Sequence, residues 1–305
     1  MELIGKTKID FIGMKKISFV ISSIIAIIGL IGVVQIGRGA ANMGIDFSGG
    51  TAVQLKFSQP VSIEQARAAL AKHNLAEANL QEITEGNKLL IKVGKTTLAT
   101  GKAADTIVDV FTKEMPGNKF EVESSMEIGP SIGDKLRKDT LVAVAISLLG
   151  IIIYIAWRFD FKFGIGATLA TLHDVLAMFA VFLLLNKEVN LLFITAVLTI
   201  AGYSLTDTVV VFDRIRENLH KNLKESMQTV FNRSINEVLS RTIITSLTTF
   251  LASMSLFLFG GEVIHDFAFA LVIGVLVGTY SSIFVASPIV ALWEERAVKA
   301  VQVKP

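Results

Sequence analysis

Cysteine is absent from this chain of 305 residues. Its absence excludes disulfide bonds, cysteine-ligated zinc, thiol chemistry and a lipid-modified cysteine. Charge is also scarce, because Asp, Glu, Lys and Arg make up only 18% of the residues, and the net charge of +2 does not indicate nucleic-acid binding. A domain outside the cytoplasm would therefore have to hold together by packing alone.

Long uncharged runs take the place of the missing charges. Hydrophobic residues are 52% of the chain, and the mean hydropathy is +0.59. Runs of about 18 or more apolar residues are typical of transmembrane helices. A cleaved signal peptide is the alternative for the first run, but that run is longer than a usual signal core, and Arg38 lies where a cleavage site would begin. The predicted spans are 17–36, 140–157, 163–186, 189–211, 242–261 and 267–293.

The distribution of Lys and Arg predicts the orientation of these spans. If the N-terminus is cytoplasmic, the short loops on the opposite side hold only Lys187. Both termini are therefore expected in the cytoplasm, and residues 38–139 form one large external segment. The cytoplasmic basic residues are then Lys6, Lys8, Lys15, Lys16, Arg158, Lys162, Arg214, Arg216, Lys221, Lys224, Arg233, Arg296, Lys299 and Lys304.

The connection between the fourth and fifth spans, residues 213–240, carries apolar residues at helical spacing with basic residues between them. This pattern predicts one or two amphipathic helices lying at the membrane surface. Packing at the interface is the favoured explanation, and a partner-docking site is the alternative. The apolar positions are Ile215, Leu219, Leu223, Phe231, Ile235 and Leu239.

The external segment predicts a small α+β domain. Alternating or apolar stretches at 51–57, 78–84, 88–93 and 119–127 predict strands, with the turn EGN between the second and third. Ser62 and Gln65 form a capping-box pair that opens a helix, and residues 101–114 have helical spacing. The order strand, helix, strand, strand, helix, strand is that of a ferredoxin-like βαββαβ domain. The predicted fold class is thus an α-helical integral membrane protein with six spans and one such domain.

Three stretches are more specific than composition. In MGIDFSGGT, residues 43–51, Gly49 and Gly50 predict a tight turn in conformations that only glycine tolerates. A phosphate-binding loop is the alternative, but the stretch lacks the Lys and Ser/Thr of such a loop and no helix follows. IGPSIGDKL leads into the second span, and IAGYSLTDTVVVFDR ends the fourth. The structural motif residues are Gly44, Asp46, Gly49, Gly50, Gly129 and Pro130.

These motifs together resemble the SecF family of protein-export membrane proteins. The resemblance covers nearly the whole chain in order and spacing. It is carried by GIDFSGG at 44–50, GPSIG at 129–133, YIAWRFDFKF at 154–163, LHDV at 172–175, GYSLTDTVVVFDRIREN at 202–218 and SRTIITS at 240–246.

The resemblance implies a multi-pass protein of the bacterial inner membrane with one periplasmic ferredoxin-like domain. It also implies a SecD partner, use of the proton motive force, and assistance to the SecYEG channel and the SecA motor in moving a translocating polypeptide. YajC is a further candidate partner; no cofactor, metal or enzymatic activity is expected. The expected segments are 1–37 for the cytoplasmic N-terminus and first helix, 38–139 for the periplasmic domain with its linkers, 140–293 for helices two to six, and 294–305 for the cytoplasmic tail.

Asp207 is the residue whose position most needs explaining. A charge at the bilayer centre costs about 2.5–3.5 kcal/mol on insertion scales, and Asp207 lies roughly 6 Å inside its predicted span at the helical rise. The carboxylate should therefore face protein or water, with Arg241 at the start of the fifth span as its partner. Small or polar residues are expected to wall this polar core: Thr245, Thr248, Ala252 and Ser255 in the fifth span, and Ala167, Ala170, Asp174 and Ala177 in the third.

The resemblance associates a proton pathway with Asp207 and Arg241. Asp174, nearer the middle of its span, is a second candidate. Its neighbour His173 points about 100° away around the helix, so the two are not expected to face one partner. The purely structural alternative is a fixed Asp207–Arg241 ion pair that holds helices together.

Three other classes compete with a translocase subunit. The main alternative is a small-molecule or lipid exporter of the resistance-nodulation-division type, although such exporters usually have far larger external domains. A structural scaffold would tolerate a neutral residue at position 207. An intramembrane hydrolase would need a metal-ligand cluster or a Ser/His pair, and the sequence offers neither at convincing spacing.

Overall fold

The computed structural model describes residues 7–83, 86–94, 102–221 and 225–302. The chain divides into two compact units. One is a helical unit formed by the chain up to Asn42 and from Ala143 onward, and the other is the segment Met43–Val142.

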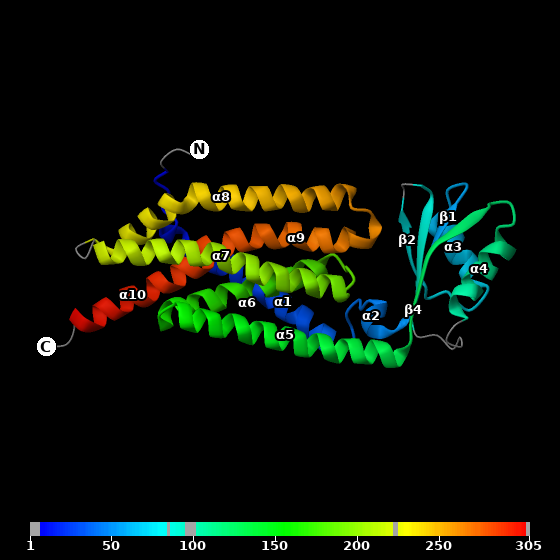
Figure 1. Ribbon diagram of the computed structural model, residues 1–305, viewed down its shortest axis with the longest axis horizontal. Coiled ribbons are helices and arrows are strands. Elements are labelled where there is room, and N and C mark those ends of the chain that lie inside the picture. Colours follow the sequence, from blue (N-terminus) through cyan, green and yellow to red (C-terminus); the bar gives the residue numbers. More distant parts are fainter. Residues whose placement is uncertain (1–6, 84–85, 95–101, 222–224, 303–305) are drawn as a thin grey trace. The chain divides into compact units, whose positions relative to one another are not determined.

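Among the described residues, six helices are long and apolar enough to cross a membrane, and each predicted span falls on one of them (Figure 1). The sixth helix is continuous but changes its winding, from α to π and back to α. The helices are α1 (Lys15–Gly37, preceded by the 3-10 turn η1, Ile12–Met14), α5 (Pro130–Arg158), α6 (Phe161–Leu184), α7 (Leu191–Lys221), α8 (Met227–Phe259) and α9 (Glu262–Ser281), which continues through the π turn η2 (Ser282–Ala286) into α10 (Ser287–Gln302).

The connection 213–240 differs from the prediction of separate surface helices. Helix α7 continues to Lys221, and α8 begins directly after Ser226, whose hydroxyl accepts the Thr229 N–H at 3.2 Å. No Gly or Pro interrupts this stretch, so nothing breaks the two helices earlier. The apolar positions pack into the helical core rather than face a membrane surface. Ile215, Phe231, Ile235 and Leu239 are buried, Leu219 is partly buried, and Leu223 lies outside the described residues.

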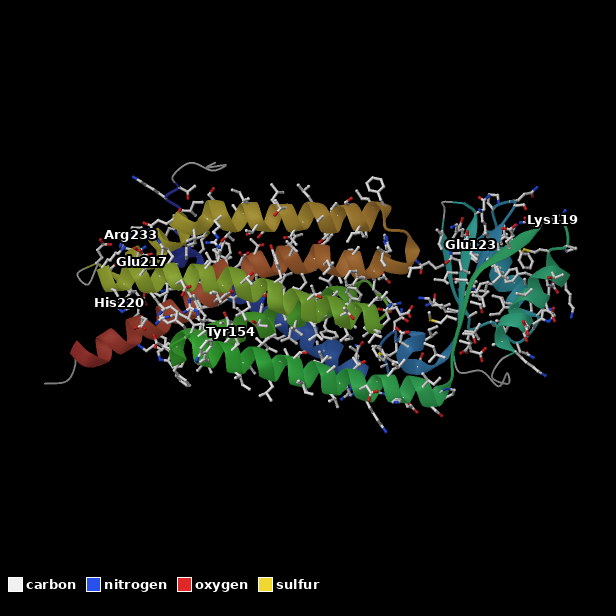
Figure 2. The ribbon with its side chains drawn as sticks, in the orientation of Figure 1. Lys119, Glu123, Tyr154, Glu217, His220 and Arg233 are labelled. Carbon is white, nitrogen blue, oxygen red and sulfur yellow. The ribbon has the colours of Figure 1, made fainter. Side chains whose placement is uncertain are left out.

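The charged side chains at this end pair with one another. Arg214 donates to Glu237 at 2.6 Å and to Glu217 at 2.5 Å, and Arg233 pairs with Glu225 at 2.8 Å. Figure 2 shows Glu217 and Arg233 together at the ends of α7 and α8 that adjoin their connection. Arg214 and Arg233, two of the basic residues that predicted a cytoplasmic connection, are therefore held in ion pairs on a helical surface.

The segment before α1 is fastened to α8, which the sequence did not predict. Asn236 accepts the Ile9 N–H at 3.0 Å and donates to the Ile9 carbonyl at 2.9 Å. One turn earlier, Asn232 accepts the Ile12 N–H at 2.9 Å. Phe11 and Ile12 are buried in the same core as Phe231 and Ile235. The N-terminal end of α1 and the start of α8 thus form one packed body.

An exposed carboxylate completes this attachment. The Gly13 N–H, at 2.8 Å, and then the Asn232 and Gln228 amides hold the pKa of the Asp10 carboxyl below its ordinary value. Because the pKa is lower in the folded state, the contribution of these bonds is present above the unfolded pKa of Asp10 and is lost as the pH falls through the folded pKa.

Helix α1 packs closely on α6 through its small residues. Ser18, Ser22, Gly29 and Gly32 are the buried positions of α1. A Cβ atom at Gly29 would overlap the carbonyl oxygen of Leu176 on α6. Without a hydrophobic driving force between helices in lipid, such close approach of backbones supplies the contact.

The external segment folds as the predicted ferredoxin-like domain. Its elements are β1 (Gly50–Phe57), α3 (Ile63–Ala71), β2 (Asn79–Ile83), β3 (Lys88–Val93), α4 (Ala103–Glu114) and β4 (Phe120–Ile128). The four-stranded sheet has the order β2-β3-β1-β4, with every pairing antiparallel. The capping box of Ser62 and Gln65 is present, and part of the predicted EGN turn lies outside the described residues. One short helix, α2 (Ile45–Ser48), was not predicted.

The domain is held by an apolar core between the sheet and its two helices. Leu55, Leu89 and Ile91 from the strands pack against Ile107 and Phe111 of α4, and all five are at most 1% exposed. Because no disulfide can assist, this packing is the main source of stability.

We expect a fragment of residues 42–137 to fold alone. Its strands, helices and core all lie within one compact unit. Circular dichroism should show both helix and strand signals, and thermal unfolding should be a single cooperative transition. A mostly helical spectrum, or gradual loss of signal without a midpoint, would contradict an independent α+β domain.

Candidate functional site

The Asp207 carboxylate faces helix α8 inside the protein. The residue is only 6% exposed. Its two oxygens accept hydrogen bonds from Thr245 Oγ1 and Ser246 Oγ, each at 3.4 Å. Ser246 in turn accepts from Thr279 Oγ1 of α9 at 2.7 Å. A carboxylate in a membrane-spanning helix is thus linked to two neighbouring helices through hydroxyl groups.

The predicted direct pair of Asp207 with Arg241 is wrong for this structure. Arg241 is exposed, and within the described part of the chain it forms no ion pair with Asp207. Arg241 lies one turn before Thr245, whose hydroxyl bonds both to the Arg241 carbonyl, at 3.2 Å, and to the Asp207 carboxylate. The shorter hydroxyl side chains reach the carboxylate, while the longer arginine side chain extends outward.

The predicted polar wall of α8 agrees with the structure only in part, because Thr245 reaches the Asp207 carboxylate while the row as a whole is exposed. Thr245, Thr248, Ala252 and Ser255 lie on an exposed face of this chain. The buried face carries a parallel row of hydroxyl residues instead, Thr242, Ser246 and Ser253. Both rows have helical spacing, so periodicity could not decide between them. On α6 the prediction agrees with the structure, because Ala167, Ala170, Asp174 and Ala177 are all buried.

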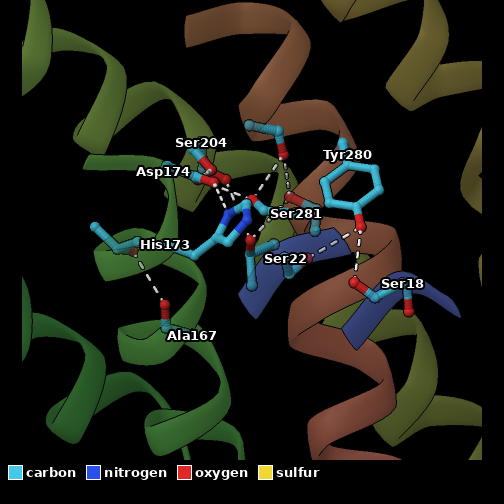
Figure 3. A network of polar contacts seen from close by, with 12 residues as sticks. Ser18, Ser22, Ala167, His173, Asp174, Ser204, Tyr280 and Ser281 are labelled. Atoms are coloured by element: carbon cyan, nitrogen blue, oxygen red, sulfur yellow. Dashed lines mark hydrogen bonds and ion pairs between the residues drawn. The ribbon is translucent and has the colours of Figure 1, made fainter. Parts of the chain in front are cut away.

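Asp174 lies at the centre of a second polar network (Figure 3). It is fully buried on α6. Its Oδ2 atom accepts hydrogen bonds from Ser204 Oγ of α7 at 2.5 Å and from Ser281 Oγ of α9 at 2.8 Å. Its Oδ1 atom lies 3.2 Å from Nδ1 of His173. The two side chains contact each other, which the sequence did not predict, but they do not share a third partner among the described residues.

The same network extends to α1 through Tyr280. The Tyr280 hydroxyl lies 3.0 Å from Ser22 Oγ and donates to the Ser18 carbonyl at 3.1 Å. Its ring packs beside the His173 ring, with centroids 6.0 Å apart. Figure 3 shows these groups between the helices. Four helices, α1, α6, α7 and α9, therefore share one buried polar centre.

The π turn η2 adjoins this centre. Ser282 is the first residue of the turn, and its Oγ lies 2.9 Å from Thr208 Oγ1 of α7. The Ser287 hydroxyl, just after the turn, donates to the Ser282 carbonyl five residues back at 2.9 Å. Single π turns inside helices are frequent at functional sites. The sequence analysis missed Tyr280, Ser281 and Ser282, although three consecutive polar residues in an apolar span are a readable signal.

The two glycine motifs meet within the external domain. Gly49 has φ 70° and Gly50 has φ 141°, both in the region that favours glycine. A Cβ at Gly49 would lie 3.3 Å from Pro130 Cα, and one at Gly133 would lie 3.0 Å from Gly49 N. The start of β1 thus packs directly on the first turn of α5.

The remaining motif residues shape the ends of the helices. Gly44 precedes α2 in extended conformation, and Asp46 lies in the first turn of that helix, where its charge suits the helix dipole. The Gly129 carbonyl accepts the Ile132 and Gly133 N–H groups, both at 3.0 Å, and Pro130 is the first residue of α5, the position that proline favours. The motifs therefore fix the points where the domain joins the spans.

No grouping of His and acidic residues that could hold a metal ion occurs within the described ranges. The candidate site is thus a pair of buried carboxylates and their hydroxyl donors.

Comparisons with known proteins agree with this architecture. The family model for the C-terminal part of protein export membrane protein SecD/SecF matches residues 107–296, and the model for the SecD/SecF GG motif matches residues 41–61. The protein translocase subunit SecF of Thermodesulfovibrio yellowstonii is 52% identical over 96% of this chain and 97% of its own. The protein of the same name from Calditerrivibrio nitroreducens is 43% identical over 96% of each chain.

A solved structure shows the same fold. The crystal structure of SecDF, a translocon-associated membrane protein from Thermus thermophilus, superposes with a TM-score of 0.84 and 35% identity over 97% of this chain. The match spans 40% of the SecDF chain. With matching family models over most of its length, close relatives along its whole length and a shared fold, this chain belongs to the SecD/SecF family of protein-export membrane proteins.

Proposed function

We propose that this SecF-type subunit of the bacterial inner membrane couples the proton motive force to protein translocation. It acts with a SecD partner beside the SecYEG channel and the SecA motor, and YajC is a further partner. Protein translocation, rather than the export of small molecules or lipids, is the role supported by the relatives, which carry the name of a translocase subunit.

The observation that carries the proton coupling is the environment of Asp207. The carboxylate is buried in a membrane-spanning helix, and within the described ranges its hydrogen-bond donors are two hydroxyls of α8. When ionised, it needs these donors; when protonated, it becomes a donor itself and no longer attracts them in the same way. Binding and release of a proton therefore favour different contacts between α7 and α8.

The energy available is sufficient for such a change. Moving one charge through a potential of 100 mV is worth about 2.3 kcal/mol, which can bias two helix packings that differ by a few kcal/mol. Helices α1 and α5 continue covalently into the external domain at its two ends. A rearrangement among the helices can therefore reach the domain on the far side of the membrane. Arg241 and Asp174 are further members of the proposed pathway.

Export into sealed vesicles tests this function. Vesicles that contain the translocase, the SecD partner and this chain should export a presecretory protein faster than vesicles without this chain. An uncoupler should abolish that difference and leave the ATP-driven export unchanged. If the stimulation by this chain persists in the presence of the uncoupler, the proposed proton coupling is wrong.

We also propose that both termini and the α7–α8 connection are cytoplasmic. The basic residues of the short loops favour this orientation. Because the chain lacks cysteine, Lys113→Cys in α4 and Lys221→Cys at the end of α7, both exposed positions, provide single labelling sites without background. A membrane-impermeant maleimide should label position 113 only from the periplasmic side and position 221 only from the cytoplasmic side. The reverse pattern would overturn the topology.

A further inference from the structure

We propose that His173 passes the proton to Asp174, so that the two form a relay in the polar centre of α1, α6, α7 and α9. This inference rests on the proposed proton coupling and names a residue that acts in it. His173 and Asp174 are adjacent on α6, and their side chains contact each other. The second ring nitrogen of His173 has no hydrogen-bond partner among the described residues.

The two ring nitrogens of His173 have different surroundings. Nδ1 lies 3.2 Å from Asp174 Oδ1. Nε2 is buried, and among the described residues it has no hydrogen-bond partner. The whole His173 side chain is only 5% exposed. A buried ring nitrogen without a partner is costly in either tautomer, since it is either a donor without an acceptor or an acceptor without a donor.

That unpartnered nitrogen is the entry point for a proton. In the starting state, Asp174 is ionised and the neutral ring carries its proton on Nδ1, which it donates to Oδ1. A proton from water binds at Nε2, and the Nδ1 proton moves to Oδ1. The ring ends neutral with its proton on Nε2, and Asp174 ends protonated. The reverse steps return one proton to water, so atoms and charge balance in both directions.

The surrounding side chains suit this exchange. From α7 and α9, Ser204 and Ser281 donate to Oδ2 and leave Oδ1 to the imidazole. From α1, Ser22 faces Tyr280, whose hydroxyl also donates to the Ser18 carbonyl of that helix. Asp207, one turn beyond Ser204, bonds to α8 instead. Within the part of the chain that the structure describes, no ion pair links Asp174 to Lys or Arg, so protons alone set the charge of the pair.

A purely positional role for His173 is the alternative, in which Nδ1 only orients the carboxylate. His173→Asn separates the two roles. The asparagine amide can occupy the place of Nδ1 and donate to Oδ1, but it cannot accept a proton at one end and release another at the opposite end. Thr171→Val is the matched control, since Thr171 is buried on the same helix and its hydroxyl bonds only to its own backbone, at the Ala167 carbonyl.

The test measures the uncoupler-sensitive part of export into sealed vesicles between pH 6 and 8, normalised to the amount of protein in the membrane. Wild type and Thr171→Val should show equal stimulation with the same pH profile. In His173→Asn, the uncoupler-sensitive stimulation should be at least about tenfold smaller than in wild type at every pH, while ATP-driven export continues. If His173→Asn does not accumulate, His173→Gln, a second neutral amide, takes its place.

Asp207→Asn, measured in parallel, distinguishes the possible failures. If His173→Asn keeps wild-type stimulation and pH profile while Asp207→Asn loses the stimulation, the relay is wrong and proton coupling stands. If both variants keep it, the proposed function fails as well. A loss in Thr171→Val equal to that in His173→Asn would assign the effect to packing of α6 and would overturn the relay.

Discussion

Replacing Asp207 by asparagine is expected to abolish the response of export to the proton motive force while leaving the protein in the membrane. Asparagine keeps the size of the side chain and its hydrogen-bonding capacity toward Thr245 and Ser246, which lie 3.4 Å from the carboxylate. It removes only the ionisation. Since a charge within the bilayer costs about 2.5–3.5 kcal/mol at the centre, the neutral amide should ease insertion rather than impair it.

The measurement is export of a presecretory protein into sealed vesicles with and without an uncoupler. Stimulation in the Asp207→Asn vesicles should fall to the level that the wild type shows with uncoupler. Asp213→Asn is the matched control, because Asp213 is on the same helix but is partly exposed to solvent and pairs with Arg158 at 2.6 Å. An exposed ion pair of this kind is worth about 0–1 kcal/mol, so this variant should retain its stimulation. Full stimulation in Asp207→Asn would show that this carboxylate does not bind the transported proton.

The separation of Arg241 from Asp207 bears on how such a site can switch. A fixed ion pair would hold the carboxylate ionised and oppose protonation. In this structure hydroxyl groups hold the carboxylate instead, and Arg241 lies on the exposed face of α8. In the proposed pathway, Asp207 would then exchange its proton without breaking a salt bridge, and the charge of Arg241 would be left for another conformation or a partner.

The sequence predicted the architecture because each part left a local signal. Uncharged runs revealed the six spans, and alternation with a capping box at Ser62 and Gln65 revealed the external domain. The extension of the spans beyond the apolar run could not be predicted in the same way. The ends of α7 and α8 are polar on one side only, and that pattern fits both a surface helix and a helix packed on the bundle. Tertiary contacts to Phe11 and Ile12 decide between them.

The site was predicted less completely than the fold. Asp207 and Asp174 were found because a carboxylate in an apolar run is conspicuous. Of their hydroxyl partners, Thr245 was also named, but Ser246 was not, since the spacing of residues along α8 does not decide which of the two faces is buried. The convergence of His173 and Asp174 also depends on side-chain torsions, which the spacing of residues along a helix does not specify. Contacts between helices therefore had to come from the structure.

Gly50→Ala in the first glycine motif is expected to lower the stability of the external domain strongly, to the point where the domain is close to unfolding. Gly50 has φ 141°, and a Cβ there would overlap the carbonyl oxygen of Val93 on the paired strand β3. A side chain in such a backbone region costs roughly 1–3 kcal/mol, and overpacking against a fixed backbone atom adds about 1–3 kcal/mol. For a domain of this size, the sum corresponds to a melting temperature lower by more than about 10 °C.

Gly129→Ala is the contrasting variant within the second motif. Apart from its chain neighbours, no heavy atom of the described residues lies within 4 Å of a Cβ at Gly129, and the residue does not have a positive φ. Thermal unfolding of the 42–137 fragment, and protease resistance of the domain in the full chain, should therefore show a large loss for Gly50→Ala and less than about 1 kcal/mol for Gly129→Ala. Equal stability of the two variants would mean that the strand can shift away from Val93. The first glycine motif would then have to act through something other than the backbone geometry at the start of β1.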